Sequence, residues 1–292
     1  MIVEKYFSEN MNNISVGIAN VNPVTRNLEQ NQKKIISALD IFAEKKTNLV
    51  VFPEYCLTGY LWENEKECRS YMKNSCLDHL SEWLDKIIQS YLSESLQYIV
   101  FNGFKKSRKD SDKFFNVTFV VDQTGNYLNE NRTYKKTYLP DLEKKYLLSG
   151  INDTLILETK WGKFGFLTCW DIAFPKLAGQ MVKKNKIDAL IVNAAWRKQG
   201  TREYETLNIK KTSYNKYLWD LALPALAFQN QTWVMAANAV GQHSLEGVDY
   251  CGGSGIWAPS GINMLKASES KEELLILHNI NIMNEIKAER RE

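Results

Sequence analysis

The chain contains 292 residues, of which 44% are hydrophobic and 24% are charged. This composition is typical of a soluble globular protein with a large core, and it excludes an intrinsically disordered chain. The 37 basic and 34 acidic residues give a net charge of only +3 and are spread along the sequence, so we expect neither nucleic acid nor a membrane as a partner.

The cysteine content bears on cellular compartment and on metal binding. The chain has five cysteines, with no Cys-x-x-Cys spacing and no histidine-rich segment, so neither a disulfide framework nor a zinc site is expected. The first 13 residues lack the apolar core of a secretory signal, and no apolar run approaches the roughly 18 residues of a membrane span. We therefore predict a soluble, cytoplasmic protein that holds no metal.

Hydrophobic periodicity predicts alternating strands and helices in the first half of the chain. The turn residues 123–126 indicate an antiparallel hairpin of the two strands that flank them. The strand at 48–52 is continuously apolar, which is typical of a strand buried on both faces, and it ends in Pro53 and Glu54. The expected strands are 14–19, 48–52, 98–101, 114–122 and 127–134, and the expected helices are 26–46 and 77–92.

The second half continues with strand pairs and two further helices. Its mixture of βα units and hairpins predicts one α/β domain over residues 14–283, with two mixed β-sheets packed together under outer helices. Residues 1–13 are predicted as an N-terminal extension and 284–292 as a charged tail. The polar stretch 197–216 has no clear pattern, and a loop of that length is usually functional or mobile. The expected strands are 155–159, 163–168, 189–193, 232–239, 255–258, 263–265 and 274–280, and the expected helices are 173–185 and 217–230.

Cys169 is the residue of this pattern that most suggests chemistry. Glycine and apolar side chains lead through the predicted strand 163–168 to this cysteine, and Trp170 and Asp171 follow it. Free cysteine is among the most buried residue types, so a small core residue and a nucleophile are both open interpretations. The three histidines of the chain lie in a helix, in a loop and near the end of the chain, so a cysteine–histidine pair is not expected.

Two charged residues at other strand ends could take the place of histidine. Glu54 and Lys136 each end a predicted strand, and strand ends are where α/β proteins gather functional groups. A buried carboxylate can accept the thiol proton, and an ammonium can hold developing negative charge. Taken singly, each residue is more often a cap or a solvated charge. Together with Cys169 they predict a catalytic site.

Three segments around these residues resemble, in the same order, the catalytic motifs of the nitrilase superfamily of carbon–nitrogen hydrolases. They are 49–54, 134–139 and 169–175, and the resemblance continues through 228–238 and 253–261. The resemblance implies an αββα sandwich, two of which usually pair into a four-layered αββα–αββα homodimer. It also implies hydrolysis of a non-peptide C–N bond without a metal or an organic cofactor.

The resemblance implies a role for each residue of the predicted site. Glu54 matches the general base, Lys136 the cation that stabilises the tetrahedral intermediate, and Cys169 the nucleophile that forms a thioester. The backbone N–H of Trp170 would be a further oxyanion donor. Glu143 matches a second glutamate that positions the substrate or the lysine, although an acid at the start of a surface helix stays an open interpretation.

The sequence departs from the family pattern at three supporting positions. Tyr138 stands where histidine is frequent, and Lys176 and Gln229 stand where glutamate is frequent. These positions support the site and do not supply its reacting groups, so the predicted chemistry is unchanged. The sequence does not define which residues support the site in their place. Asp171, two residues after the cysteine, is similar to amidases and N-carbamoyl hydrolases rather than to true nitrilases, so a small linear amide or ureido substrate is favoured.

Pocket residues are predicted from their position near the motifs. Tyr60 and Trp196 would supply apolar walls. Arg197 is either a solvent-facing loop residue or a fork that binds a substrate carboxylate. Three alternatives to an amide hydrolase stay open: a nitrilase, an enzyme that transfers the acyl group of the thioester to an amine, and a catalytically silent scaffold.

Overall fold

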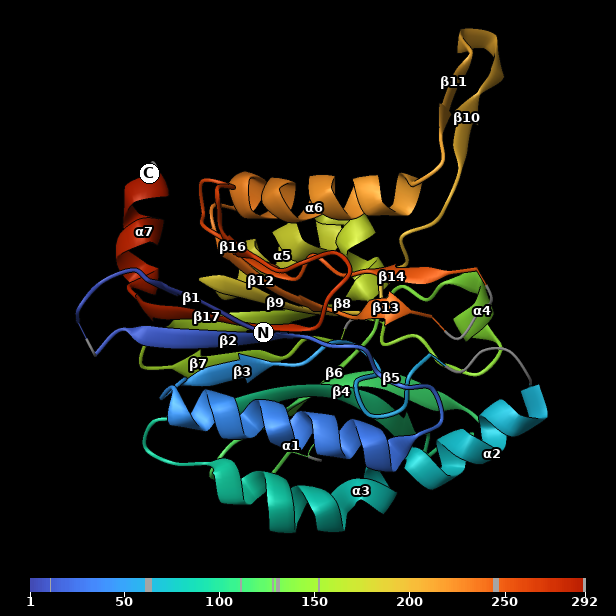
Figure 1. Cartoon of the computed structure of the whole chain (residues 1–292), viewed down its shortest axis with the longest axis horizontal. Helices are drawn as coiled ribbons and strands as arrows, with labels where there is room; N and C mark the ends of the chain where they lie inside the picture. The colour runs from blue at the N-terminus through green and yellow to red at the C-terminus, as the bar shows by residue number, and fades with distance from the viewer. Residues whose placement is uncertain are drawn as a thin grey trace.

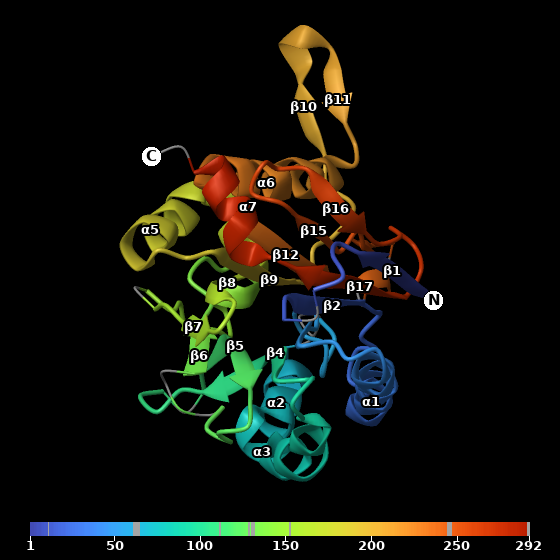
Figure 2. The same cartoon turned by 90° about the vertical axis from the view of Figure 1, so that its left-hand side faces the viewer.

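Two large β-sheets packed face to face form the framework of the protein. The computed structural model describes residues 1–10, 12–60, 65–110, 112–127, 129, 132–151, 153–243 and 247–290. Helices cover the outer face of each sheet, so the layers follow one another in the order α, β, β, α (Figures 1 and 2). Among the described residues, no helix is long and apolar enough to cross a lipid bilayer. The layer order confirms the predicted α/β fold with two mixed sheets and outer helices.

The first sheet has seven strands in the order β1-β17-β2-β3-β4-β5-β6. Strand β2 runs parallel to β3 and β3 parallel to β4, whereas β4, β5 and β6 are antiparallel neighbours. The strands are β1 (Ile2–Tyr6), β2 (Ile14–Asn20), β3 (Leu49–Val51), β4 (Tyr98–Lys106), β5 (Phe114–Val121), β6 (Thr133–Lys135) and β17 (Glu273–Ile280). The covering helices are α1 (Leu28–Glu44), α2 (Glu65–Ser75) and α3 (Leu77–Trp83), the last continued by a π turn at Leu84–Ile88 and a 3₁₀ turn at Gln89–Tyr91.

The second sheet has six strands in the order β16-β15-β12-β9-β8-β7. Its three central strands, β12, β9 and β8, are parallel, and antiparallel strands flank them on both sides. Helices α5 (Pro175–Asn185) and α6 (Tyr214–Asn230) cover its outer face (Figure 1). The strands are β7 (Ile156–Thr159), β8 (Gly162–Thr168), β9 (Ala189–Ala194), β12 (Trp233–Asn238), β15 (Gly255–Trp257) and β16 (Asn263–Lys266).

Apolar side chains from both sheets meet in the space between them. Strand alternation sends Val16 and Ile18 of β2 into this core, where Ile191 of β9 and Met235 of β12 come from the opposite sheet. All four side chains are fully buried. Burial of one such side chain contributes about 1.5–3 kcal/mol. The packed interior therefore holds the ends of both sheets in fixed positions, and these ends carry the candidate site.

Residues 2–6 and 282–289 belong to the fold, which corrects two predictions. The sequence predicts residues 1–13 as an extension, but β1 pairs parallel with β17 at the edge of the first sheet. It predicts residues 284–292 as a charged tail, but α7 (Ile282–Glu289) extends into this range and buries Ile286. Strand β1 is largely exposed, so it lacks the apolar run by which a buried strand is recognised. Helix α7 is short, and two buried isoleucines give too little periodicity to detect.

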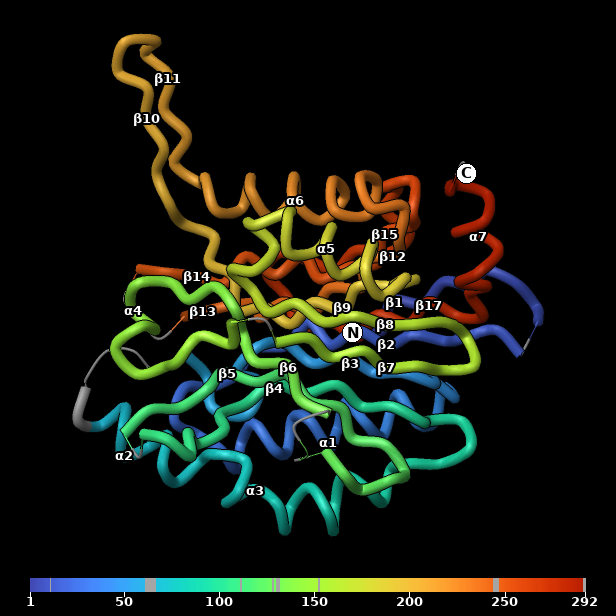
Figure 3. Tube along the Cα trace, turned by 180° about the vertical axis from the view of Figure 1, so that it is seen from behind, coloured from blue at the N-terminus to red at the C-terminus, as the bar shows by residue number. Residues whose placement is uncertain are grey.

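The polar stretch after β9 forms a projecting ribbon, which we call the arm and define as residues 201–212. Strands β10 (Arg202–Tyr204) and β11 (Ile209–Lys211) pair antiparallel around a 3₁₀ turn at Glu205–Leu207. Every residue of the arm is exposed. The arm extends away from the body of the domain beyond α6 (Figures 1 and 3). Two smaller strands, β13 (Val240–Gln242) and β14 (Asp249–Cys251), pair beside its base.

Candidate active site

The three strand-end residues predicted from the sequence meet between the two sheets. Glu54 comes shortly after β3, Lys136 directly follows β6, and Cys169 directly follows β8. The Nζ atom of Lys136 lies 2.8 Å from Glu54 Oε1 and 2.9 and 3.0 Å from the two carboxylate oxygens of Glu143. All four side chains are buried. Lys136 therefore bridges two carboxylates, and the thiol lies in the same cluster.

Glu54 is held in place by donors from both sheets. Its Oε1 atom accepts a hydrogen bond of 2.7 Å from Asn116 Nδ2, in addition to the one from Lys136. Its Oε2 atom accepts a hydrogen bond of 3.0 Å from the backbone N–H of Ala195. Asn102 Nδ2 donates in turn to the side-chain oxygen of Asn116 at 2.7 Å, which fixes the amide orientation. These hydrogen bonds fix the position and orientation of the Glu54 carboxylate.

Sequence reasoning missed Asn102, Asn116 and Ala195. The two asparagines lie in β4 and β5, in which nearly all neighbouring residues are apolar, and both are fully or almost fully buried. A buried asparagine needs hydrogen-bond partners, so a polar residue inside an apolar strand is a signal that could have been used. The backbone N–H of Ala195 carries no such signal, because any residue type could supply it.

Glu143 lies on a short helix that points it inward. Helix α4 (Asp141–Lys144) leaves Asp141, Leu142 and Lys144 exposed and buries Glu143 against Lys136. The hydroxyl of Tyr60 donates to Glu143 Oε1 at 3.5 Å. Glu143 is therefore not a surface acid at a helix start, and the structure places it in the same charge cluster as Glu54.

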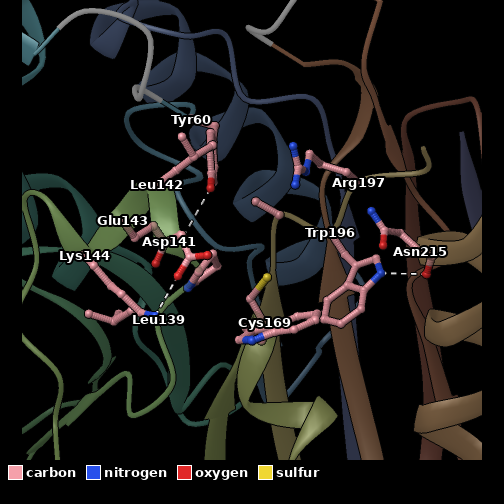
Figure 4. Close-up of a pocket in the computed structure, with 13 residues that line it drawn as sticks. Tyr60, Leu139, Asp141, Leu142, Glu143, Lys144, Cys169, Trp196, Arg197 and Asn215 are labelled. Atoms are coloured by element: carbon pink, nitrogen blue, oxygen red, sulfur yellow. Dashed lines mark hydrogen bonds and ion pairs between the residues drawn. The ribbon is translucent and has the colours of Figure 1, made fainter. Parts of the chain in front are cut away.

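Cys169 sits at a sharp turn between β8 and a 3₁₀ helix at Cys169–Ala173. Its φ angle is +49°, a left-handed conformation that costs a residue with a side chain about 1–3 kcal/mol. The turn directs the thiol into a cavity (Figure 4). The backbone N–H of Trp170 lies in the first turn of this helix, where amides have no partner within the helix. The oxyanion-donor role that the family resemblance implies for Trp170 stays a prediction.

Asp171 fixes the turn that carries the cysteine. Its Oδ2 atom accepts hydrogen bonds from the Thr168 N–H at 3.0 Å and the Tyr134 hydroxyl at 2.7 Å. Its Oδ1 atom accepts from the Tyr138 N–H at 2.8 Å, and the Thr168 hydroxyl caps the N–H of Asp171 in return. Asp171 thus ties the end of β8 to the segment after β6, and the strained backbone of Cys169 is held from both sides.

Burial and charge set the protonation of the cluster. Burial, together with the negative charge of Glu54, raises the pKa of the Cys169 thiol well above its ordinary value, and Lys136 offsets only part of this. Burial alone would lower the pKa of Lys136, but the charges of Glu143 and Glu54 raise it well above the usual range. Burial raises the pKa of Glu143 to about 7 against the opposing charge of Lys136. The resting site therefore holds a neutral thiol, a fixed cation and a carboxylate able to accept a proton.

The cluster opens into a cavity of about 380 Å³. Tyr60, Trp196 and Arg197, the predicted pocket residues, all belong to its wall, and the Cys169 sulfur faces its interior (Figure 4). The rings of Trp170 and Trp196 pack with their centroids 5.4 Å apart, and Trp196 Nε1 donates to the backbone oxygen of Asn215 at 2.7 Å. The lining residues are Tyr60, Leu139, Pro140, Asp141, Leu142, Glu143, Lys144, Cys169, Trp170, Ala195, Trp196, Arg197 and Asn215.

The three departures from the family pattern lie outside the charge cluster. The Tyr138 ring stacks on Phe174 with a centroid distance of 3.6 Å. Lys176 and Gln229 are exposed. In the part of the chain that the structure describes, no three His, Cys, Asp or Glu side chains gather in a way that could hold a metal ion. The side chains that match the family's catalytic motifs are therefore present in spite of the departures.

Gly150 supports the backbone of Lys136. Its N–H donates to the Lys136 carbonyl at 2.9 Å, and a Cβ atom at this glycine would lie 2.2 Å from the Lys135 carbonyl oxygen. We expect Gly150→Ala to lower the free energy of unfolding by about 1–3 kcal/mol. The new Cβ atom would clash with the backbone of Lys135, which cannot move aside as a flexible side chain can. Urea denaturation measures this change.

Gly179→Ala is the matched control for that substitution. A Cβ atom at Gly179, inside α5, would meet only Asn230 Oδ1 at the ordinary distance of 3.5 Å. Alanine should there be neutral or stabilise the helix by up to about 1 kcal/mol. Equal stability of the two variants would contradict the role assigned to Gly150.

The comparison with known families decides what kind of protein carries this site. A family model described as carbon-nitrogen hydrolase matches residues 15–282. The chain belongs to the carbon–nitrogen hydrolase family, within the nitrilase superfamily. This hydrolase is similar to a probable nitrilase of Schizosaccharomyces pombe, with 28% identity over 263 residues that cover 89% of this chain and 86% of the relative.

Two further comparisons come from the amidase side of the family. The hydrolase is 26% identical to the deaminated glutathione amidase of Dictyostelium discoideum over 240 residues. These residues cover 75% of this chain and 72% of the relative. Its fold is similar to that of an amidase from Nesterenkonia sp. AN1, with a TM-score of 0.72 and 17% identity over 95% of this chain and 96% of the other. These similarities support the family, and the amidase structure supports the fold.

Proposed function

We propose that this hydrolase cleaves the C–N bond of a small linear amide or N-carbamoyl compound through a thioester on Cys169. The observation that carries the proposal is the position of Lys136, which bridges Glu54 and Glu143 in a buried cluster that also holds the thiol. A thiol that is neutral at rest needs a base, and Glu54 is the group placed to be that base.

The first half-reaction forms the thioester. The Cys169 sulfur attacks the carbonyl carbon while Glu54 takes the thiol proton. The carbonyl oxygen becomes an oxyanion that accepts hydrogen bonds from Lys136 Nζ and the Trp170 N–H, and loss of one such donor typically costs about 10²–10³ in rate. The C–N bond then breaks, the leaving nitrogen takes the proton from Glu54, and ammonia or an amine departs.

The second half-reaction releases the acid. Glu54, ionised again, takes a proton from water, and the hydroxide that forms attacks the thioester carbon. The second tetrahedral intermediate is held by the same two donors. The C–S bond breaks, the thiolate regains the proton from Glu54, and the carboxylic acid leaves. Glu54 therefore carries the proton in both half-reactions, and the site returns to its starting state.

An amide or ureido substrate fits this site because its leaving nitrogen needs the proton that Glu54 has taken. The similarity to an amidase of Dictyostelium discoideum and the aspartate at position 171 support the same choice. A nitrile is the second candidate, which the similarity to a probable nitrilase favours. Transfer of the acyl group to an amine is a third outcome of the same thioester.

A substrate panel tests the proposal. The purified protein is incubated with primary amides, ureido acids and nitriles, and released ammonia and acid are quantified. We expect turnover of amides or ureido compounds and slower or no turnover of the matching nitriles. Preferential turnover of nitriles would favour the second candidate, and a new amide formed with an added amine would favour acyl transfer. No turnover with any class would contradict the hydrolase assignment and favour a catalytically silent scaffold.

The pKa of Glu143 predicts the acid side of the pH profile. Because this pKa is raised to about 7, Glu143 is ionised above this pH and protonated below it. Protonation removes one negative charge beside Lys136 and weakens the ion pair that positions this lysine. We expect kcat/KM to fall as the pH drops through about 7, with the apparent pKa belonging to the whole cluster.

Glu143→Gln should remove this dependence. The neutral amide mimics the protonated state at every pH, so we expect kcat/KM to be about tenfold lower at high pH and flat through neutral pH, since loss of a charged hydrogen bond costs on the order of 1.5 kcal/mol. Glu82→Gln is the control, because Glu82 is exposed, pairs with Lys86 and lies outside the cavity lining. An unchanged profile in Glu143→Gln would show that another group sets the acid limb.

A further inference from the structure

The charges that line the cavity are paired, with one exception. Lys144 Nζ lies 2.7 Å from Asp141 Oδ1, and Glu143 lies 2.9 Å from Lys136. Arg197, the remaining charged residue of the lining, forms no ion pair with any residue that the structure describes. A half-buried guanidinium on a cavity wall loses part of its hydration, and it recovers that loss when an anion enters.

The backbone on each side of Arg197 is fixed. The Trp196 carbonyl accepts a hydrogen bond from the Cys251 N–H at 2.8 Å, and the Lys198 N–H donates to the Asp249 carbonyl at 2.8 Å. These bonds attach the segment that holds Arg197 to strand β14. The position of the arginine is therefore set by the fold and not by the exposed arm that follows it.

The neighbour of Arg197 does not neutralise its charge. His243 is buried with its ring 4.6 Å from that of Tyr60 and 4.7 Å from that of Tyr250. Burial, and then the positive charge of Arg197, lower the pKa of His243 to about 4. The imidazole is neutral at physiological pH, so His243 adds neither a negative nor a second positive charge beside Arg197.

The cavity is polarised between two walls. Figure 4 shows the guanidinium of Arg197 on one side and the Glu143 carboxylate on the other, with the Cys169 thiol between and below them. An anionic substrate is repelled by the glutamate side and attracted by the arginine side. It would enter with its negative end at Arg197 and leave its uncharged end over the thiol.

We propose that Arg197 binds a carboxylate of the substrate, so that the preferred substrates are small amide acids whose amide and carboxylate lie at opposite ends. This inference rests on the proposed function and narrows its substrate class. The planar guanidinium can hold both carboxylate oxygens at once, which fixes the rotation of the substrate as well as its position. Arg197 thereby acts as a specificity-determining residue that places the amide carbon at the sulfur.

Matched pairs of amides test this inference. Succinamate and glutaramate are compared with butyramide and valeramide, which are similar in size and lack the carboxylate. For the wild type we expect a higher kcat/KM with the amide acids. Arg197→Gln should lower that value by about 10- to 100-fold, mainly through KM, and leave the neutral amides within about threefold. Arg197→Lys should recover part of the loss.

Lys198→Gln is the control for a general effect of charge. Lys198 is the next cation in the chain and is not part of the cavity lining, so its removal should leave both substrate types unchanged. The inference would be overturned if Lys198→Gln and Arg197→Gln lowered kcat/KM for amide acids equally. It would also be overturned if the wild type had the same kcat/KM for amide acids and neutral amides. Neither result would contradict the hydrolase function.

Binding to Cys169→Ala separates this inference from the proposed function. Calorimetry with succinamate and butyramide measures recognition without turnover. We expect succinamate to bind more tightly, and the double variant Cys169→Ala, Arg197→Gln to lose this preference. Such a preference without any turnover by the wild type would support Arg197 and contradict the hydrolase proposal. Failure of succinamate to bind more tightly than butyramide would overturn the carboxylate subsite.

Discussion

Cys169→Ala is expected to abolish amide hydrolysis, with a loss in kcat on the order of 10⁶-fold, the scale seen when a covalent hydrolase loses its nucleophile. Alanine leaves no atom that can form the thioester, and neither Glu54 nor Lys136 can replace the sulfur. The folded state should be retained, because the side chain that is removed is small and faces the cavity. Ammonia release, measured beside circular dichroism and thermal unfolding, checks both statements.

Cys76→Ala controls for the loss of a buried cysteine. Cys76 is almost fully buried at the start of α3, and it is not part of the cavity lining. This variant should keep nearly full activity even if it loses some stability. If Cys169→Ala kept a turnover rate close to that of the wild type, Cys169 would not be the nucleophile.

Glu54→Gln is expected to lower kcat/KM by about 10²–10⁴-fold, the range that general acid–base catalysis supplies. The amide cannot accept the thiol proton or return one to the leaving nitrogen, so both half-reactions slow. Lys136 keeps its pair with Glu143 in this variant, so the cation is not left alone in the interior. Steady-state kinetics at several pH values, with a stability measurement beside them, gives the size of the loss.

Glu158→Gln is the corresponding control. Glu158 is an exposed strand residue that pairs with Lys163 at 2.7 Å, and such a surface pair contributes at most about 1 kcal/mol. Its removal should leave turnover unchanged. If Glu54→Gln retained wild-type rates in both half-reactions, another group would have to carry the protons, and the base assigned here would be wrong.

The positions of Glu54, Lys136 and Cys169 are visible in the sequence for a physical reason. Glu54 and Cys169 follow strands with a strong apolar pattern, and Lys136 follows the short strand β6. Strands that pack in the same core bring their ends together. The order of the three motifs and the family resemblance point to the same residues. The structure adds the distances and the burial, and these turn three strand-end residues into one charge cluster.

The support of the site could not be predicted in the same way. The donors that hold Glu54 are separated from it by 62 residues at Asn116 and by 141 at Ala195, so only the packing of the sheets reveals them. Arg197 left two interpretations open in the sequence, and its place in the cavity wall favours a role toward the substrate. Strand β1 and helix α7 were missed because each owes its position to contacts with distant segments and only weakly to its own pattern.

The central claim is that catalysis proceeds through an acyl group on Cys169, and trapping of that group tests it most directly. The wild type is mixed with an amide that it turns over, quenched in acid within the first turnover, and analysed by mass spectrometry of the intact protein and of its peptides. We predict a mass increase equal to the acyl group on the peptide that contains Cys169, and none in Cys169→Ala. Turnover without this adduct, or an adduct on another residue, would contradict the account.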